Sequence, residues 1–422
     1  MISAKGYATA ILLGFAVLAG LTGCGTKRTE VTPTPQPAVA PPPPQGMAKP
    51  PGIRVAMLVP TTGETAAVGE ALVNGAQMAL FDLGDDQINL LVKDTGASPD
   101  QAIQQVQAAI ADKADIILGP LFSSAAKAAA PIARQNNVPM IAFSNDVTVA
   151  GQGVYVLGVT PETQIQRVVG YAIAQGKTRF AAAVPADAYG EVSLQALQDA
   201  TARLGGTVVT SLTYQPGDWS IATFKPLQPA AVGGYDALLL PAGGQELMFV
   251  ASLLAAADVD QPTVRFLGTR QMADIRLAKL EPALDGSWFA DTPSGSWDAF
   301  SERYQSTYGS EPRKVAALGY DAMAIAAVLG KGQASAPTSP YTPSALTRPD
   351  GFAGVDGLFR FLPDGRSERA LNVLRLTRND LIILDPAPSS FTPSPQAGSE
   401  AFPTAQGPAT NFPAPLPPVP AS

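Results

Sequence analysis

Short continuous apolar runs alternate along this chain with segments whose apolar residues recur every three or four positions. Continuous runs are typical of strands buried on both faces, and the three-to-four spacing is typical of helices that cover a sheet. We expect strands near residues 55–59, 88–92, 115–118, 139–143, 154–157, 180–184, 207–212, 237–240 and 264–267. With helices between them, the alternation predicts an α/β fold with parallel sheets covered on both faces.

The pattern changes in the last third of the chain. After Trp288, periodic segments predict helices over residues 297–308 and 314–329. Residues 354–384 predict antiparallel strands, with turns at Pro363-Asp364-Gly365 and Arg378-Asn379-Asp380. The earlier part holds two successive α/β units of similar length. Ligands bind outside the carboxyl ends of such sheets, so two facing sheets predict a cleft.

The N-terminal segment ends in Leu21-Thr22-Gly23-Cys24, which resembles a bacterial lipobox. A basic start and a short apolar run over residues 8–21 precede it, as in a signal peptide. We therefore expect residues 1–23 to be removed and Cys24, the lone cysteine, to carry lipid. An uncleaved anchor or a plain secretory signal remain alternatives. Gly25 follows the cysteine in place of the Asp that retains lipoproteins in the inner membrane of enteric bacteria, which favours the outer membrane.

Two proline-rich segments flank the periodic region. Residues 24–52 include the run Pro41 to Pro44, and we expect a semi-rigid, solvated tether there. Residues 386–422 contain 11 prolines and lose all periodicity, so we expect a disordered tail. The folded part is expected over residues 53–385.

Composition narrows the function. The chain is 46% hydrophobic, carries a net charge of −7, and has one cysteine and no histidine. The acidic balance argues against a nucleic-acid partner. The missing histidines remove Ser-His-Asp and Cys-His catalysis and histidine metal ligation. We expect no metal and no cofactor, and a protein that is not an enzyme, although a carboxylate-based enzyme such as a glycan hydrolase stays open.

Five phrases resemble one family, the type I periplasmic binding proteins, which include the Leu/Ile/Val receptors. They are residues 116–121 (IILGPL), 138–142 (VPMIA), 187–190 (DAYG), 317–322 (ALGYDA) and 361–365 (FLPDG). The resemblance implies two Rossmann-like lobes joined by three crossovers, near residues 155–161, 286–292 and 347–355. It implies a first lobe of about 53–158 and 290–346, and a second of about 159–289 and 347–385.

The resemblance also implies a ligand-binding cleft. The family's hydroxyl residues for a ligand carboxylate match Ser123, Ser144 and Thr148, and its second-lobe aromatic matches Tyr189. Asp146 adds a negative charge to that carboxylate site. Ser123 and Ser144 are equally compatible with helix caps.

Two positions depart from the family's pattern. Arg270 stands where an acidic residue normally pairs with the ligand ammonium, and an arginine repels that group. Gln245 replaces an expected aromatic residue. A structural pairing of Arg270 with Asp274 is the alternative to ligand binding.

Two branches of the family compete for the function. The first is the penicillin-binding protein activator, a lipoprotein that binds and stimulates a peptidoglycan synthase and so regulates cell-wall synthesis. The lipid anchor, the tether and residues 238–245 (LLLPAGGQ) resemble this branch, although better-known members carry a further N-terminal helical-repeat domain. The alternative is the solute-binding receptor of an ABC importer for amino acids, amides or another small polar ligand. Either implies a periplasmic protein held to a membrane through Cys24.

Overall fold

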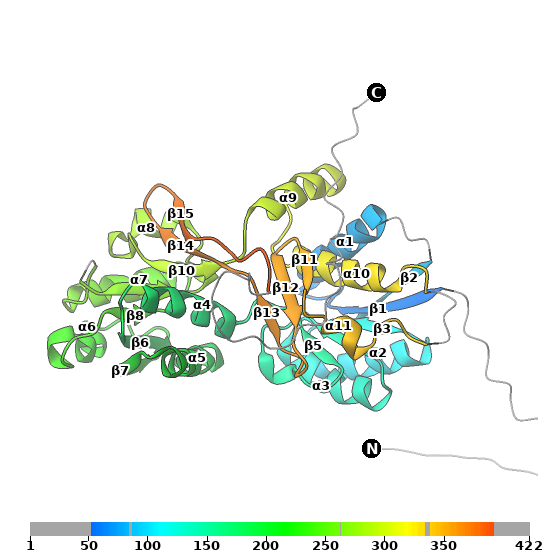
Figure 1. Cartoon of the computed structure of the whole chain (residues 1–422), viewed down its shortest axis with the longest axis horizontal. Coiled ribbons are helices and arrows are strands. Elements are labelled where there is room, and N and C mark those ends of the chain that lie inside the picture. The colour runs from blue at the N-terminus through cyan, green and yellow to red at the C-terminus, as the bar shows by residue number, and fades with distance from the viewer. Residues whose placement is uncertain (1–51, 84–86, 262, 334–337, 392–422) are drawn as a thin grey trace, which may run out of the picture. The chain divides into compact units, whose positions relative to one another are not determined.

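The computed structural model describes residues 52–83, 87–261, 263–333 and 338–391, and among these residues the strands form three sheets (Figure 1). Cys24, the expected signal peptide and all of the expected tether except Gly52 lie outside the described residues.

The first lobe is built on a five-stranded parallel sheet with the order β2-β1-β3-β4-β5. Its strands are β1 (Ile53–Val59), β2 (Ile88–Asp94), β3 (Ile116–Leu118), β4 (Met140–Ala142) and β5 (Val154–Val156). The helices of this lobe are α1 (Ala66–Leu83), α2 (Pro99–Ala111), α3 (Ser123–Gln135), α9 (Gly295–Tyr308), α10 (Ala316–Gly330) and the short α11 (Pro343–Leu346). The predicted parallel sheet is confirmed.

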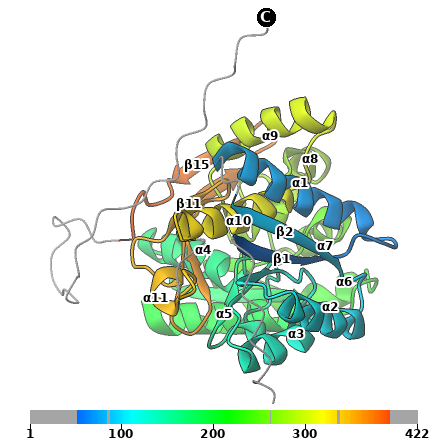
Figure 2. The ribbon, with the colours of Figure 1, turned by 90° about the vertical axis from the view of Figure 1, so that its right-hand side faces the viewer.

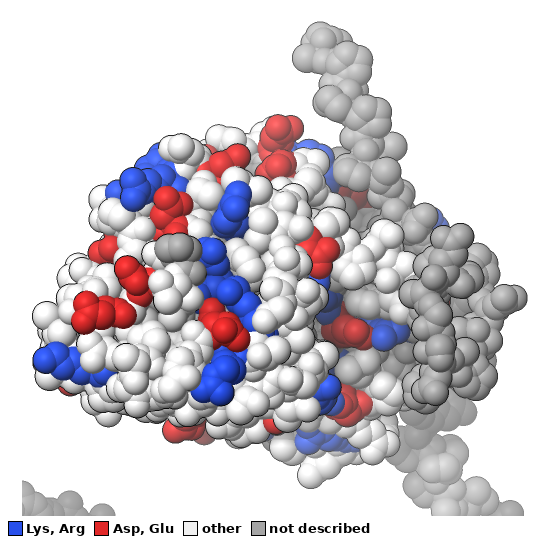
Figure 3. All heavy atoms as spheres, turned by 60° about the vertical axis from the view of Figure 1, so that its left-hand side comes forward, with Lys and Arg blue, Asp and Glu red and all other residues white. Residues whose placement is uncertain are grey.

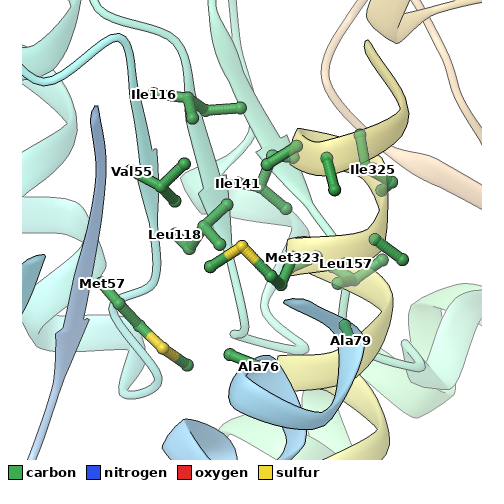
Figure 4. Close-up of a cluster of buried hydrophobic side chains, with 14 of the residues drawn as sticks. Val55, Met57, Ala76, Ala79, Ile116, Leu118, Ile141, Leu157, Met323 and Ile325 are labelled. Carbon is green, nitrogen blue, oxygen red and sulfur yellow. The ribbon is translucent and has the colours of Figure 1, made fainter. Parts of the chain in front are cut away.

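Alternation along β1 explains why this sheet is covered on both sides. Val55 and Met57 pack in one core with α1 and α10, while Ala56 and Leu58 pack in another with α2 and α3. Figure 2 shows α1 and α10 on one side of β1 and β2, with α2 and α3 on the other. In Figure 4, Met323 and Ile325 of α10 point toward Leu118 and Ile141 of the sheet. The continuous apolar run of β1 therefore exists because both faces of this strand are buried.

The second lobe contains a seven-stranded sheet with the order β15-β14-β10-β9-β8-β6-β7. Its strands are β6 (Arg179–Pro185), β7 (Thr207–Tyr214), β8 (Ala237–Leu239), β9 (Arg265–Gly268), β10 (Trp288–Asp291), β14 (Asn372–Leu376) and β15 (Leu381–Asp385). Its helices are α4 (Pro161–Ala174), α5 (Ala188–Leu204), α6 (Ile221–Phe224), α7 (Gly244–Ala256) and α8 (Ile275–Leu280). β14 and β15 are antiparallel to their neighbours, so this sheet is mixed.

The segment after α11 divides between the lobes. Its first part forms a separate antiparallel sheet of β11 (Phe352–Gly354), β12 (Gly357–Phe361) and β13 (Ser367–Arg369). Phe352, Phe359 and Phe361 belong to the hydrophobic core of the first lobe. The expected boundary at residue 347 is therefore displaced, and the chain enters the second lobe only after Arg369.

Three short connections join the lobes, over residues 157–160, 292–294 and 370–371. The first agrees with the expected position. The second begins later than expected because Trp288 to Asp291 form strand β10. The third was expected near 347–355 and lies about twenty residues further on, since β11 to β13 stay with the first lobe.

The first residues of the expected disordered tail are docked on the folded part. Arg167 of α4 donates to the carbonyl oxygen of Pro386 at 3.2 Å. The Ala387 amide donates to Asn372 Oδ1 at 2.7 Å. The ordered chain thus extends past the expected end at 385, and residues 392–422 lie outside the described part.

The helices of the described residues include none that is long and apolar enough to cross a membrane. On the face in Figure 3, basic and acidic side chains are interspersed rather than gathered by sign.

The contact between α1 and α10 depends on two glycines. A Cβ on Gly75 would lie 2.1 Å from the Ala316 carbonyl oxygen, and one on Gly319 would lie 2.0 Å from that of Leu72. We predict that Gly75→Ala lowers the free energy of unfolding by about 1–3 kcal/mol, because the two backbones must separate. Gly295→Ala is the matched control, since nothing lies within 4 Å of its Cβ position. Urea unfolding of both variants tests this, and equal stability of the two would contradict the packing argument.

Candidate functional site

Asp146 is the centre of the polar cluster in the first lobe. It follows β4 and precedes a short 3-10 turn, Val147–Val149. Its carboxylate accepts hydrogen bonds from the hydroxyl groups of Ser123 and, at 2.6 Å, Thr148, and it pairs with Lys127 at 2.8 Å. The Asp146 amide donates to Ser144 Oγ at 3.1 Å. The structure therefore brings together all four first-lobe residues that the sequence predicted.

These contacts keep Asp146 ionised. Partial burial alone would raise its pKa, but hydrogen bonds from Lys127, Ser123 and Thr148 outweigh burial and hold that pKa well below the usual range. The hydroxyl groups expected to receive a ligand carboxylate are already donating to an internal one. The capping alternative is not observed at Ser123, because the N-cap of α3 is Phe122, without a side-chain hydrogen bond.

A second cluster lies in the second lobe around Arg270. Its Nε contacts Asp291 Oδ1 at 3.3 Å, and its backbone amide donates to Gln164 Oε1 at 2.7 Å. The neighbouring Thr269 accepts a hydrogen bond from the Tyr189 hydroxyl at 3.0 Å. Tyr189, in the first turn of α5, and Arg270, after β9, therefore share one site at the carboxyl ends of their strands.

Two details of this cluster differ from expectation. Arg270 does not pair with Asp274, which instead contacts Arg276 at 2.7 Å. Gln245 is exposed in the first turn of α7, and none of the hydrogen bonds described for the structure links it to Arg270 or Tyr189. Gln245 is therefore the predicted residue that the structure does not connect to the others.

Glu162 lies between the two clusters and was missed by sequence reasoning. Burial raises its pKa, and the negative charge of Asp146 raises it further. Glu162 in turn acts on Tyr189, whose pKa is raised first by burial and then by this carboxylate, while the positive charge of Arg270 opposes both. One oxygen of Glu162, Oε2, is buried and has no hydrogen-bond partner among the residues that the structure describes. Glu162 thus links the electrostatics of the two lobes.

Glu162 and Gln164 both belong to the first turn of α4, directly after the first crossover. Pro161 marks the start of this helix in the sequence. The sequence does not show that its first turn faces the Asp146 cluster, and polar residues in a first turn are most often solvated.

A buried ionic network joins the crossovers. Arg369 is 6% exposed and donates through Nη2 to the carbonyl oxygen of Leu157. Asp321 is 1% exposed and accepts a hydrogen bond from the Val355 amide at 2.7 Å. Asp356, also buried, lies 3.4 Å from the Thr292 hydroxyl. This network connects α10 with all three interlobe segments.

Surface hollows of the described residues include one beside Glu162 and one beside β7. The smaller, about 330 Å³, is lined by Glu162, Gln166, Arg366 and parts of α5. The larger, about 500 Å³, runs along β7 and α5, and none of the predicted site residues lines it. Size alone therefore does not identify the candidate site, and the polar clusters around Asp146 and Arg270 identify it better.

Comparison with known proteins gives a family and a fold. The model of a family described as "Periplasmic binding protein" matches residues 52–380. Among curated proteins, an uncharacterized protein of Rickettsia prowazekii (strain Madrid E) is 29% identical over 147 residues, which are 35% of this chain and 39% of that protein. The match thus spans well under half the length of this relative.

Solved structures resemble nearly the whole described part. A branched-chain amino acid ABC transporter periplasmic ligand-binding protein of Burkholderia xenovorans is 18% identical, covers 81% of this chain and 97% of its own, and has a TM-score of 0.65. An ABC transporter solute-binding protein of Rhodopseudomonas palustris, in complex with 3,4-dihydroxybenzoic acid, is 21% identical. The match covers 82% of this chain and 99% of that protein, with a TM-score of 0.58. The branched-chain amino acid binding protein LivJ of Streptococcus pneumoniae, in complex with isoleucine, is 18% identical. The match covers 79% of this chain and 100% of that protein, with a TM-score of 0.57. At these identities the likeness is one of fold.

The ionic network predicts a pH-dependent stability. Burial, and then the like charge of Asp356, raises the pKa of Asp321 to about 7 from an ordinary 3.8. Between these two pH values the folded state binds more protons than the unfolded state, so stability falls as pH rises through this window. We predict that Asp321→Asn flattens this decline when the free energy of unfolding is measured from about pH 5 to pH 8.

Asp274→Asn serves as the control. The hydrogen bond from Arg276 lowers the pKa of Asp274, so its contribution to stability is lost only as pH falls below that window. An unchanged slope in Asp321→Asn would contradict the assignment.

Proposed function

Because this chain belongs to the periplasmic binding protein family, we propose that it is a receptor that binds a small anionic solute between its two lobes and presents it to an ABC importer. The family acts in the periplasm. The observation that carries the proposal is Arg270, which stands among Tyr189, Gln164 and Asp291 where an amino-acid receptor needs an acidic residue.

The chemistry of Arg270 favours a carboxylate ligand. A guanidinium group has five N–H donors in a planar fork, which matches the two oxygens of a carboxylate. The ion pair with Asp291 uses Nε, and the side chain is 24% exposed. The remaining donors can therefore hold a ligand carboxylate in two parallel hydrogen bonds.

The first lobe suits the end of the ligand that lies away from its carboxylate. Asp146 is ionised and occupies the hydroxyl groups of Ser123 and Thr148, so a ligand carboxylate there would meet a like charge. Hydroxyl or amide donors of a ligand would instead suit Asp146 and Glu162. The site therefore has reversed polarity compared with the expected amino-acid site, and we propose a carboxylic acid without an ammonium group beside the carboxylate.

The ligand of the Rhodopseudomonas palustris protein, 3,4-dihydroxybenzoic acid, has this chemistry: one carboxylate and hydroxyl donors at the far end. Its presence in that protein supports the proposal at the level of ligand class, because the same fold accepts such an acid. Binding without chemical conversion, by closure of the lobes about the crossovers, is the proposed mode of action.

The receptor proposal takes precedence over the peptidoglycan-synthase activator that the sequence first favoured. The solved proteins described above are transporter binding proteins, which favours the alternative drawn from the sequence. A penicillin-binding protein as partner has no support from these matches.

We also propose that Cys24 anchors the receptor to a membrane by lipid, from the Leu21-Thr22-Gly23-Cys24 motif. Metabolic labelling with a fatty-acid analogue tests this. Cys24→Ser is expected to abolish labelling and to release the protein from membranes, because the thiol that would carry the lipid is gone. Thr26→Ser, two residues further on, is the matched control and should label like the wild type. Equal labelling of Cys24→Ser and the wild type would contradict the anchor.

The binding site itself can be tested with Arg270→Gln. We expect thermal-shift screening of the wild type to select carboxylic acids such as dihydroxybenzoate over leucine, and Arg270→Gln to weaken their binding by about tenfold or more in calorimetry, because a charge-assisted pair contributes about 1.5–3 kcal/mol. Arg276→Gln is the matched control, since Arg276 also lies in the second lobe and pairs only with Asp274 among the described ion pairs. Tight leucine binding by the wild type would overturn the proposed ligand class.

A further inference from the structure

Strand β7 ends the sheet of the second lobe and has a free edge. Among the described strands only β6 pairs with it, so one row of its backbone N–H and C=O groups has no partner strand there. Such a row is a template for pairing with another strand. Thr207, Ser211 and Thr213 are exposed along this edge.

The usual protections of a free edge are weak here. β7 is eight residues long, Thr207–Tyr214, and its sequence TVVTSLTY contains no charged residue and no proline. The register shifts by one residue at Val209, which disturbs the start of the strand, while pairing with β6 is regular from Thr210 to Tyr214. From Thr210 to Tyr214 the strand is therefore regular and uncharged, with Ser211 and Thr213 exposed.

The other edges of the described parallel and mixed sheets differ in these respects. β15, at the opposite edge of the same sheet, has five residues, and its Asp385 is held by Arg167. In the first-lobe sheet, the edge strand β2 carries Lys93 and Asp94, and the other edge strand, β5, has three residues. Charged groups and short length both oppose edge-to-edge pairing. β7 is thus the edge with the least resistance to a partner strand.

A hollow of about 500 Å³ runs beside this edge. It is lined by residues 206–211 and by Gln198, Thr201 and Ala202 of α5, and none of these side chains is charged. Space beside an unpaired edge, without charged groups to desolvate, suits an uncharged extended strand rather than a charged peptide.

We infer that β7 pairs antiparallel with β7 of a second copy, so that two molecules join their second-lobe sheets about a two-fold axis. A second copy presents the same uncharged strand and the same row of donors and acceptors, which makes the contact self-complementary. The net charge of −7 makes two copies repel one another, so contact is favoured where both surfaces lack charge. This inference is independent of the proposed ligand.

The first test is the oligomeric state of the full chain carrying Cys24→Ser, in mild detergent, by analytical ultracentrifugation over a roughly hundredfold range of concentration. A monomer–dimer equilibrium is expected, and a monomer throughout would overturn the inference. In Ser211→Lys/Thr213→Lys, dimerisation should weaken by roughly tenfold or more, because like charges then face one another across the pair.

Ile383→Lys is the matched control, since Ile383 is 53% exposed on β15 at the opposite edge of the sheet. It should leave the dimer intact. Unchanged thermal melting of each variant shows that folding is preserved. Equal dimerisation of the β7 variant and the wild type, or loss of the dimer in Ile383→Lys alone, would contradict pairing through β7.

A cross-linking test locates the axis. Cys24→Ser removes the one cysteine of the chain, so a single cysteine introduced at each position from 210 to 213 is the sole thiol. In a two-fold antiparallel pair the residue nearest the axis faces its own copy. One position should form a disulfide-linked dimer readily, whereas Ile383→Cys should not, and linkage at Ile383 in preference to β7 would overturn the inference.

Discussion

The two lobes of this protein depend on a small set of buried charges at the crossovers. Arg369 donates a hydrogen bond to the Leu157 carbonyl oxygen, and Asp321 accepts one from the Val355 amide. Both side chains are almost fully buried. A buried ion without compensation costs several kcal/mol, and the negative charges of Asp356 and Asp321 partly offset the burial of Arg369. The stability of the connection between the lobes is therefore electrostatic as well as hydrophobic. Residue 354 must be a glycine for this packing, because a Cβ added there would lie only 2.3 Å from Asp321 Oδ2.

The sequence was sufficient to predict the architecture because the buried strands are continuous apolar runs that few other structures accommodate. It was not sufficient to assign the residues after 347 to a lobe. Phe352, Phe359 and Phe361 alternate as any half-buried hairpin does, and their periodicity carries no information about which core receives them. The family resemblance placed the third crossover too early for the same reason, since position along the chain does not encode the neighbour in space.

The candidate site was predictable in part. Ser123, Ser144, Asp146 and Thr148 follow two strand ends, and strand ends of one parallel sheet meet, so their association follows from topology. The role of Glu162 could not be predicted in the same way, because it arises from the path of the first crossover, which brings the α4 terminus near Asp146. The partner of Arg270 was misjudged since Asp274 is close in sequence, whereas Asp291 approaches from the neighbouring strand β10.

Asp291 connects the Arg270 cluster to the second crossover. It is the last residue of β10, its carboxylate accepts the amide of Thr292 at 2.7 Å, and Thr292 begins the second crossover. Burial raises the pKa of Asp291, and the positive charge of Arg270 opposes that rise. A ligand anion that binds Arg270 competes for the same cation. In the proposed receptor, occupation of the site changes the electrostatic environment of Asp291, which lies next to the second crossover.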